Sequence, residues 1–309
     1  MWLDLLYLLG GILFLLFGGD FLVKSSVSLA QSFKVSSFLI GSLVVSVGTS
    51  FPELVVSVQS AFVGHPDIAL GNVVGSNIAN IALGLGLVAI FFPVIIKKKS
   101  VFFDWIILFV LSVFIVLFSL NGRIQRIEGL ILLLIVGYYI FNSIRRSNKA
   151  KKAGQIPQNP QYKPWIALLI LIISIVVLGG GAQLIILGGS SLALHLGVEE
   201  RIVSLTVIAF GTSLPEITTS VIASYRKHSE LAIGNIIGSN IFNIAIVLGI
   251  TTFILPIQVN VRFLSFDYYW MMGFTLILLL PIFVKGKITK LEALLMVSIY
   301  STYIYLLFF

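Results

Sequence analysis

Long apolar stretches recur along the whole chain and are separated by short clusters of charged residues, glycine and proline. Each stretch is about 20 residues long, the length that a helix needs to cross the hydrocarbon core of a bilayer. The pattern predicts an all-α polytopic membrane protein with ten transmembrane helices. The predicted spans are residues 3–23, 35–63, 67–95, 101–120, 124–144, 164–187, 199–225, 230–256, 265–284 and 289–308.

The composition supports a membrane protein and excludes an ordinary soluble domain. Hydrophobic residues make up 58% of the chain and charged residues only 10%, whereas soluble domains carry about 25% charged residues. The first nine residues, MWLDLLYLL, have no basic segment, so we expect a first spanning helix rather than a cleavable signal. The chain has no cysteine, which rules out disulfide and thiolate chemistry.

The basic residues predict the orientation in the membrane. Of the 20 Lys and Arg residues, 16 fall in one set of predicted loops and 4 in the other, and the richer side is cytoplasmic by the positive-inside rule. We therefore expect a plasma-membrane protein with both termini outside and a cytoplasmic linker at residues 145–163. This distribution explains the net charge of +8 without a nucleic-acid partner. The linker is either a solvated tether, the favoured interpretation, or a contact for anionic lipid or a regulatory partner.

The sequence repeats itself at an offset of 163 residues. GTSFPE at 48–53 matches GTSLPE at 211–216, and GNVVGSNIANI at 71–81 matches GNIIGSNIFNI at 234–244. Such self-similarity indicates a duplication, with one five-helix repeat at residues 1–144 and another at 164–309. Because five spans separate equivalent points, the second copy enters the membrane upside down. The prediction is two inverted five-helix repeats, a plan of secondary transporters with sites near the midplane.

Two of the twelve acidic residues, Glu53 and Glu216, lie deep inside predicted spans at equivalent repeat positions, while the other ten lie in loops or near span ends. A charged side chain at the centre of a bilayer costs roughly 2.5–3.5 kcal/mol on insertion scales. Two buried acids at equivalent positions indicate that a bound cation compensates their charges. The alternative is a permanently protonated structural pair. Pro52 and Pro215 precede the two acids and are expected to break both helices, releasing backbone carbonyls near Ser46 and Ala209.

Oxygen-bearing side chains surround both acids in the sequence. Hydroxyls lie three and four residues before each glutamate, and each GSN motif carries a serine and an asparagine four residues apart, which share one helix face. Four glycines, Gly71, Gly75, Gly234 and Gly238, are expected to allow close helix approach. For the serines, helix packing alone is the competing interpretation. The candidate metal-ligating residues are Glu53, Glu216, Thr49, Ser50, Ser76, Asn80, Thr212, Ser213, Ser239, Asn243, Ser46 and Ala209.

Carboxylates, hydroxyls, amides and carbonyls without imidazole or thiolate form a hard-cation donor set, which suits Ca²⁺ and Na⁺ and not zinc or copper. The three histidines, His65, His195 and His228, are expected in loops. An intramembrane protease would need paired aspartates or a Ser–His or HExxH arrangement, so we expect no enzyme. A cation channel is harder to exclude, because acidic rings also select cations. Its flux would not depend on a counter-ion.

The two pairs of motifs resemble the α-repeats of the cation/calcium antiporter superfamily, specifically prokaryotic sodium/calcium exchangers, over the whole five-plus-five topology. The resemblance implies that Glu53 and Glu216 are central ligands shared by transported Ca²⁺ and Na⁺, completed by the hydroxyls and by the carbonyls of Ser46 and Ala209. It also implies that the first and sixth spans slide across the core during alternating access. No resident cofactor is expected, and the chain is expected to function as a monomer in the lipid bilayer.

One position departs from part of the family. Asn243 occupies a place where several relatives carry aspartate, which leaves two acids in the core and disfavours a potassium requirement. The proton-coupled branch usually has Gly-Asn where this chain has Gly-Thr at 48–49 and 211–212, which favours sodium. The predicted function is secondary antiport of Ca²⁺ for Na⁺, with proton-coupled or K⁺-dependent calcium antiport as the alternative and a channel as the weakest candidate.

Overall fold

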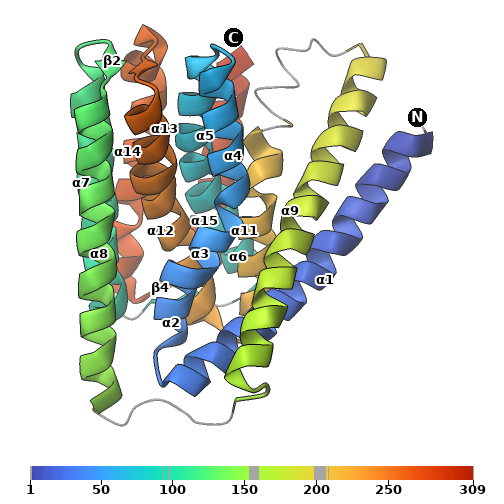
Figure 1. Cartoon of the computed structure of the whole chain (residues 1–309), viewed down its shortest axis with the longest axis vertical. Coiled ribbons are helices and arrows are strands. Elements are labelled where there is room, and N and C mark those ends of the chain that lie inside the picture. The colour runs from blue at the N-terminus through green and yellow to red at the C-terminus, as the bar shows by residue number, and fades with distance from the viewer. Residues whose placement is uncertain are drawn as a thin grey trace.

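The computed structural model describes residues 2–92, 94–96, 98–152, 160–197, 207 and 209–308, and it is mostly helical (Figure 1). The α-helices are α1 (Trp2–Phe33), α2 (Ser37–Ile40), α3 (Ser46–Thr49), α4 (Phe51–Phe62), α5 (Pro66–Ala79), α6 (Gly86–Phe91), α7 (Lys98–Ser119), α8 (Arg126–Lys152), α9 (Pro164–His195), α11 (Ala209–Tyr225), α12 (Ser229–Phe242), α13 (Gly249–Ile254), α14 (Tyr268–Ile277) and α15 (Lys290–Phe308). The π-helical segments are η1 (Gly41–Val45), η2 (Asn80–Leu85), η4 (Asn243–Leu248), η5 (Phe263–Asp267) and η6 (Pro281–Lys285).

Among the described residues, eight helical stretches are long and apolar enough to cross a membrane, or nine if the bent pair at 37–62 counts as one span. The prediction of a polytopic helical membrane protein is therefore confirmed. The predicted span at 199–225 is the one of the ten predicted spans that this count does not include. Residues 198–206 and 208 lie outside the described residues, and the described helix there, α11, has 17 residues.

Helices α1 and α9 are 32 residues each and extend well beyond the predicted ends at residues 23 and 187. A helix of this length spans about 48 Å at 1.5 Å per residue, more than the ~30 Å hydrocarbon core. Both helices run obliquely, side by side, at one flank of the molecule (Figure 1). Lys24, which was predicted to lie in a loop, pairs with Asp20 one turn earlier at 2.7 Å, so the helix continues through this polar turn.

Glycines allow the two oblique helices to pack backbone against backbone. A Cβ atom placed on Gly181 of α9 would lie 3.0 Å from the carbonyl oxygen of Gly11 on α1. A Cβ on Gly188 would lie 2.7 Å from the carbonyl oxygen of Asp4. The contacts pair low numbers on one helix with high numbers on the other, so α1 and α9 are antiparallel and form one packed unit.

The predicted linker is partly helical. Helix α8 continues past residue 144 to Lys152, and residues 153–159 lie outside the described residues. Just before α9, the Tyr162 N–H donates to Ser28 Oγ at 2.9 Å, which fastens this segment to α1. The end of α8 and the start of α9 lie at one end of the molecule, and the two chain termini lie at the other (Figure 1).

Four two-residue strands join the two halves of the chain. β1 (Val94–Ile95) pairs antiparallel with β4 (Lys287–Ile288), and β2 (Arg123–Ile124) pairs antiparallel with β3 (Ile257–Gln258). Each sheet therefore takes one strand from each repeat. β2 and β4 occupy nearly equivalent repeat positions, and Figure 1 shows them at opposite ends of the molecule.

The interior is built around two equivalent spans. Over an apolar 18-residue segment of each span, 94% of the residues are buried in Ser229–Ile254 and 78% in Pro66–Phe91, but only 28% in Pro164–His195. Large apolar side chains such as Leu6, Phe17 and Val176 are exposed on the outer helices, as expected for surfaces that meet lipid. The core therefore surrounds the GSN motifs.

The glycine prediction is confirmed on α12. A Cβ on Gly234 or Gly238 would lie 2.5 Å from a backbone carbonyl, that of Phe38 or Ser42 respectively, so α12 packs directly against α2 and η1. For Gly71 and Gly75 on α5 the equivalent partners, residues 201 and 205, lie outside the described residues, so close approach at these two glycines stays a prediction.

Candidate cation site

The helix that carries Glu53 is bent at the predicted place. α3 ends at Thr49 and α4 begins at Phe51, with an angle of 40° between the two parts. Ser50 between them has φ −82° and ψ 7°, outside the helical region. Pro52 lies in the first turn of α4, where its missing N–H has no intrahelical partner to lose. The predicted break in the first repeat is therefore confirmed.

The predicted break in the second repeat is wrong, because Pro215 lies inside the continuous helix α11. The proline ring meets the carbonyl one turn earlier, that of Gly211, and the described helix runs from Ala209 through Pro215 to Tyr225 without interruption. The two repeats thus hold their glutamates on differently shaped backbones.

Of the two predicted carbonyl ligands, that of Ser46 differs from expectation, and that of Ala209 stays a prediction. The Ser46 carbonyl is not released by the bend, because it accepts the Ser50 N–H at 3.0 Å and lies 3.4 Å from the Thr49 hydroxyl. The bend occurs after this turn of helix, so the turn stays closed. Ala209 is the first residue of α11, and its side chain lies outside the described residues.

The structure brings the two acids together in the interior. Glu53 and Glu216 are both 0% exposed, and their charges lie close enough to interact. Ser50, three residues before Glu53, donates its hydroxyl to Glu216 Oε1 at 3.0 Å. One repeat therefore contacts the carboxylate of the other directly, and neither acid faces lipid.

Most of the predicted side-chain ligands keep polar atoms without a hydrogen-bond partner. In the part of the chain that the structure describes, these buried atoms are Glu53 Oε1 and Oε2, Glu216 Oε2, Ser76 Oγ, Ser213 Oγ, and both amide atoms of Asn80 and Asn243. A buried polar group without a partner costs about 1–3 kcal/mol, and more when it is charged. So many unsatisfied oxygens around two carboxylates indicate a place for cations.

The asparagines of this set mark a change in helix geometry. Asn80 is the first residue of η2, and Asn243 is the first residue of η4. Short π-helical segments inside α-helices occur frequently at functional sites, since the wider turn re-aims side chains and carbonyls. Both asparagines are fully buried. The equivalence of the two repeats therefore extends to this backbone feature, which the sequence did not predict.

Sequence reasoning missed four further buried asparagines. Asn72 and Asn235 each bond to both repeats through their amides. Asn77 and Asn240 exchange hydrogen bonds across the repeats, each amide donating to the other residue's backbone carbonyl at 3.3 and 3.1 Å. All four stand in the duplicated motifs at the offset of 163 residues. Each of these asparagines recurs at the equivalent position of the other repeat, inside a predicted span. That recurrence of a polar amide was the signal that could have identified them.

Two other buried acids have a different environment. Asp104 accepts a hydrogen bond from the Tyr139 hydroxyl at 2.6 Å, and Asp267 accepts one from Tyr303 at 3.0 Å. They are also repeat equivalents, and their tyrosine donors satisfy them. Neither Glu53 oxygen has such a donor among the described residues, and this distinguishes Glu53 from the two aspartates.

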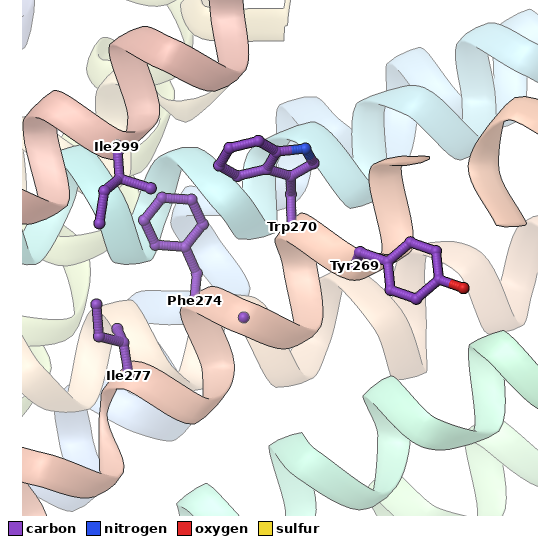
Figure 2. Close-up of a pocket in the computed structure, with 6 residues that line it drawn as sticks. Tyr269, Trp270, Phe274, Ile277 and Ile299 are labelled. Atoms are coloured by element: carbon purple, nitrogen blue, oxygen red, sulfur yellow. The ribbon is translucent and has the colours of Figure 1, made fainter. Parts of the chain in front are cut away.

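Other candidate sites are less suitable. The groove in Figure 2 is lined by Tyr269, Trp270, Gly273, Phe274 and Ile277 of α14 with Ile299 of α15, and it is apolar. Among the described residues, no group of three or more His, Cys, Asp and Glu could hold a metal. The central cluster differs from such a centre because neutral oxygens supplement its two acids.

These features define a class: a polytopic helical membrane protein with a buried, oxygen-lined centre suited to hard cations. The chain belongs to the sodium/calcium exchanger family, since the family model described as "Sodium/calcium exchanger protein" matches residues 3–145 and 166–309. This confirms the resemblance seen in the motifs, and the family is one of cation/calcium antiporters.

The chain is similar to individual proteins over most or all of its length. It is 29% identical to the sodium/calcium exchanger MaX1 of Methanosarcina acetivorans, covering 99% of both chains. It is 31% identical to the inner membrane protein YrbG of Escherichia coli, covering 84% of this chain and 83% of that protein. A solved structure of the sodium-calcium exchanger NCX_Mj, soaked with Na⁺ and Sr²⁺, superposes with a TM-score of 0.86 at 30% identity over 98% of each chain.

Proposed function

We propose that this protein exchanges Ca²⁺ for Na⁺ by alternating access at a site near the membrane midplane, between two inverted repeats. The observation that carries the proposal is the pair of fully buried, repeat-equivalent glutamates, of whose four carboxylate oxygens three have no hydrogen-bond partner among the described residues. Membership of the exchanger family and the similarity to MaX1 and NCX_Mj support the choice of ions.

The proposed ligands are those predicted from the sequence. Burial of the side chains and the orphaned oxygens support the choice; Asn80 and Asn243 would contribute amide oxygens, and the second lone pair of the Ser46 carbonyl remains available. Two carboxylates give the empty site a charge near −2. One Ca²⁺ neutralises it, whereas three Na⁺ would leave +1, so exchange in that ratio is electrogenic. The empty, charged site resists crossing the membrane, and this couples the two ions.

The inverted arrangement of the repeats is supported by the strands. β2 and β4, which are nearly equivalent, lie at opposite ends of the molecule (Figure 1), and each sheet pairs one strand from each repeat. In this proposal the antiparallel pair α1 and α9 slides as a unit over the rest. The ends of the pair would open the site first to one side of the membrane and then to the other.

The orientation follows from the distribution of basic residues. Both termini would be outside the plasma membrane and the linker at 145–163 cytoplasmic, with the monomer as the functional unit. The two termini lie at one end of the molecule and the end of α8 lies at the other (Figure 1), which supports placing the termini and the linker on opposite sides of the membrane. Proton-coupled or K⁺-dependent calcium antiport remains the alternative, and the carboxamide of Asn243 disfavours the K⁺-dependent form. A channel is the weakest candidate.

Vesicle transport tests the proposal. Calcium uptake into Na⁺-loaded proteoliposomes should fall to background in Glu53→Gln and in Glu216→Gln, because each removes half of the site's charge. Asp267→Asn is the matched control: it neutralises a buried acid outside the site, keeps an acceptor for Tyr303, and should leave uptake near wild type.

The loading ions distinguish the alternatives. Uptake driven equally by an H⁺ gradient would favour proton coupling, and an added requirement for K⁺ would favour the K⁺-dependent form. Uptake without any counter-ion would indicate a channel. Full uptake in both glutamine variants would contradict the assignment of the site.

A further inference from the structure

Asn72 on α5 connects the two repeats at the site. Its Nδ2 group donates to the backbone carbonyl of Glu53 at 3.0 Å and to Ser57 Oγ at 2.9 Å, both in its own repeat. Its Oδ1 accepts the hydroxyl hydrogen of Thr212, in the other repeat, at 3.1 Å. Asn72 is 5% exposed and Thr212 is 1% exposed, so water does not compete freely for these bonds.

Asn235 on α12 makes the equivalent connections in the opposite direction. Its Nδ2 donates to the Glu216 carbonyl at 3.1 Å and to Ser220 Oγ at 3.0 Å. Its Oδ1 accepts from the Thr49 hydroxyl at 3.3 Å. The Thr49 hydroxyl also lies 3.4 Å from the Ser46 carbonyl and from Ser239 Oγ, so the contact to Asn235 is the shortest of three.

The amide nitrogens fix which way each asparagine faces. An asparagine side chain has two N–H donors and one carbonyl oxygen. Because both donors of Asn72 are used within its own repeat, its oxygen has to face Thr212. The same argument fixes Asn235 toward Thr49. Each orientation is therefore determined by two hydrogen bonds rather than by the threonine itself.

A threonine hydroxyl has one hydrogen and two acceptor lone pairs, and it can bind a cation only through a lone pair, with the hydrogen directed away. We propose that Asn72 and Asn235 are positioning residues that take up this hydrogen, so that Thr212 and Thr49 present lone pairs to the ion. The inference rests on the proposed function, and it adds an outer shell of the kind that orients the direct ligands in metal sites.

The arrangement also explains why each asparagine reaches across the repeats. Asn72 holds the turn of Glu53 and the hydroxyl of Thr212 at once, and Asn235 holds Glu216 and Thr49. The backbone of one acid and the hydroxyl ligand of the opposite repeat are thereby fixed relative to each other. Each half of the site is correctly oriented only while the two repeats keep the relative position that allows these hydrogen bonds.

A double-mutant cycle on the purified full chain tests the proposal, with the Kd for Ca²⁺ measured by isothermal titration. Asn72→Ala and Thr212→Val should each raise the Kd about tenfold, the factor that corresponds to one lost hydrogen bond at a buried site. The double variant should be no weaker than Thr212→Val alone, because Asn72 acts through that hydroxyl. Ser57→Ala is the control, since it leaves the bond between Oδ1 and Thr212 in place, and its Kd should stay within about twofold of wild type.

An unchanged Kd in a monodisperse Asn72→Ala protein, or losses that add in the double variant, would overturn the positioning role. The equivalent cycle of Asn235→Ala with Thr49→Val, with Ser220→Ala as control, decides the matter if Asn72→Ala fails to fold. A wild-type chain that neither binds Ca²⁺ nor exchanges it would overturn this inference together with the proposed function. A wild-type chain that exchanges normally, with additive losses in the variants, would overturn the inference alone.

Discussion

At the scale of single residues, the two central glutamates are equivalent in sequence and unequal in environment. Glu216 accepts a hydrogen bond from Ser50, whereas both oxygens of Glu53 lack a partner among the described residues. The difference follows from the backbone, because the bend at Ser50 turns that hydroxyl across the repeat interface. Ser213, the equivalent of Ser50, lies in a continuous helix, and its hydroxyl has no partner in the part of the chain that the structure describes. The centre is therefore asymmetric, although its ligands are duplicated.

The number of charges at the site should set its affinity for Ca²⁺. Asn243→Asp adds a third carboxylate at a fully buried position on η4, which packs against the helix of Glu53, and calcium affinity rises with the charge of the ligands. We expect the Kd for Ca²⁺ to fall by about tenfold or more, as measured by isothermal titration at pH 8. Asn142→Asp, at a half-buried position on α8, is the control and should have no effect. A Kd for Ca²⁺ that is unchanged or higher in Asn243→Asp would place this side chain outside the site.

At the scale of elements, the sequence predicted the spans better than their ends and shapes. Apolar length located most of the spanning helices, and the acid, proline and hydroxyl pattern located the bend at Ser50. It could not show that α1 and α9 reach 32 residues, because packing and the tilt of a helix decide where it ends. Nor could it show that α11 continues through Pro215, because the same Ser-x-Pro-Glu pattern accompanies a bend in the first repeat.

The partners of buried amides were equally hard to predict. Asn72 and Asn235 stand in the quoted motifs, but the residues that they bond to lie 140 and 186 positions away in the chain. Only the three-dimensional arrangement shows that they link the two repeats. The duplicated sequence contained the amides, and the fold supplies their role.

Close packing of α12 gives a prediction with a matched pair of variants. A Cβ on Gly238 would lie 2.5 Å from the Ser42 carbonyl, whereas Gly137 on α8 is exposed and no described atom lies within 4 Å of its Cβ position. We expect Gly238→Ala to destabilise the protein by about 1–3 kcal/mol through overpacking. Gly137→Ala should not destabilise it. Thermal unfolding of the purified protein in detergent measures both, and equal midpoints would contradict the packing argument.

At the scale of the whole molecule, the chain consists of the oblique pair α1 and α9 and a core that holds the site (Figure 1). The pair also has charged contacts with the core, since Asp20 on α1 forms an ion pair with Arg226 directly after α11. Their repeat equivalents are Gln183 and Val63, which cannot form such a pair. This ion pair therefore has no counterpart related by the repeat.

Cross-links can show whether α1 and α9 slide together over the core or move relative to each other. The chain has no cysteine, so Asp20→Cys with Arg226→Cys can be bridged by a short reducible bifunctional reagent that ties α1 to the core. Exchange should stop and return on reduction. Gly10→Cys with Leu184→Cys joins the pair internally, because a Cβ on Gly10 of α1 would lie 3.7 Å from Leu184 Cδ1 on α9, and this cross-link should leave exchange intact. Transport that survives the first cross-link would contradict sliding of the pair.

The most direct test of the central claim is equilibrium binding of radioactive calcium to the purified chain during a sodium titration. The account predicts that Na⁺ displaces the bound Ca²⁺ steeply, with more than one Na⁺ per ion displaced, and that Glu53→Gln combined with Glu216→Gln binds no Ca²⁺. Calcium retained at wild-type affinity by the double variant, or indifferent to Na⁺ in the wild-type protein, would contradict a shared site at the two buried carboxylates.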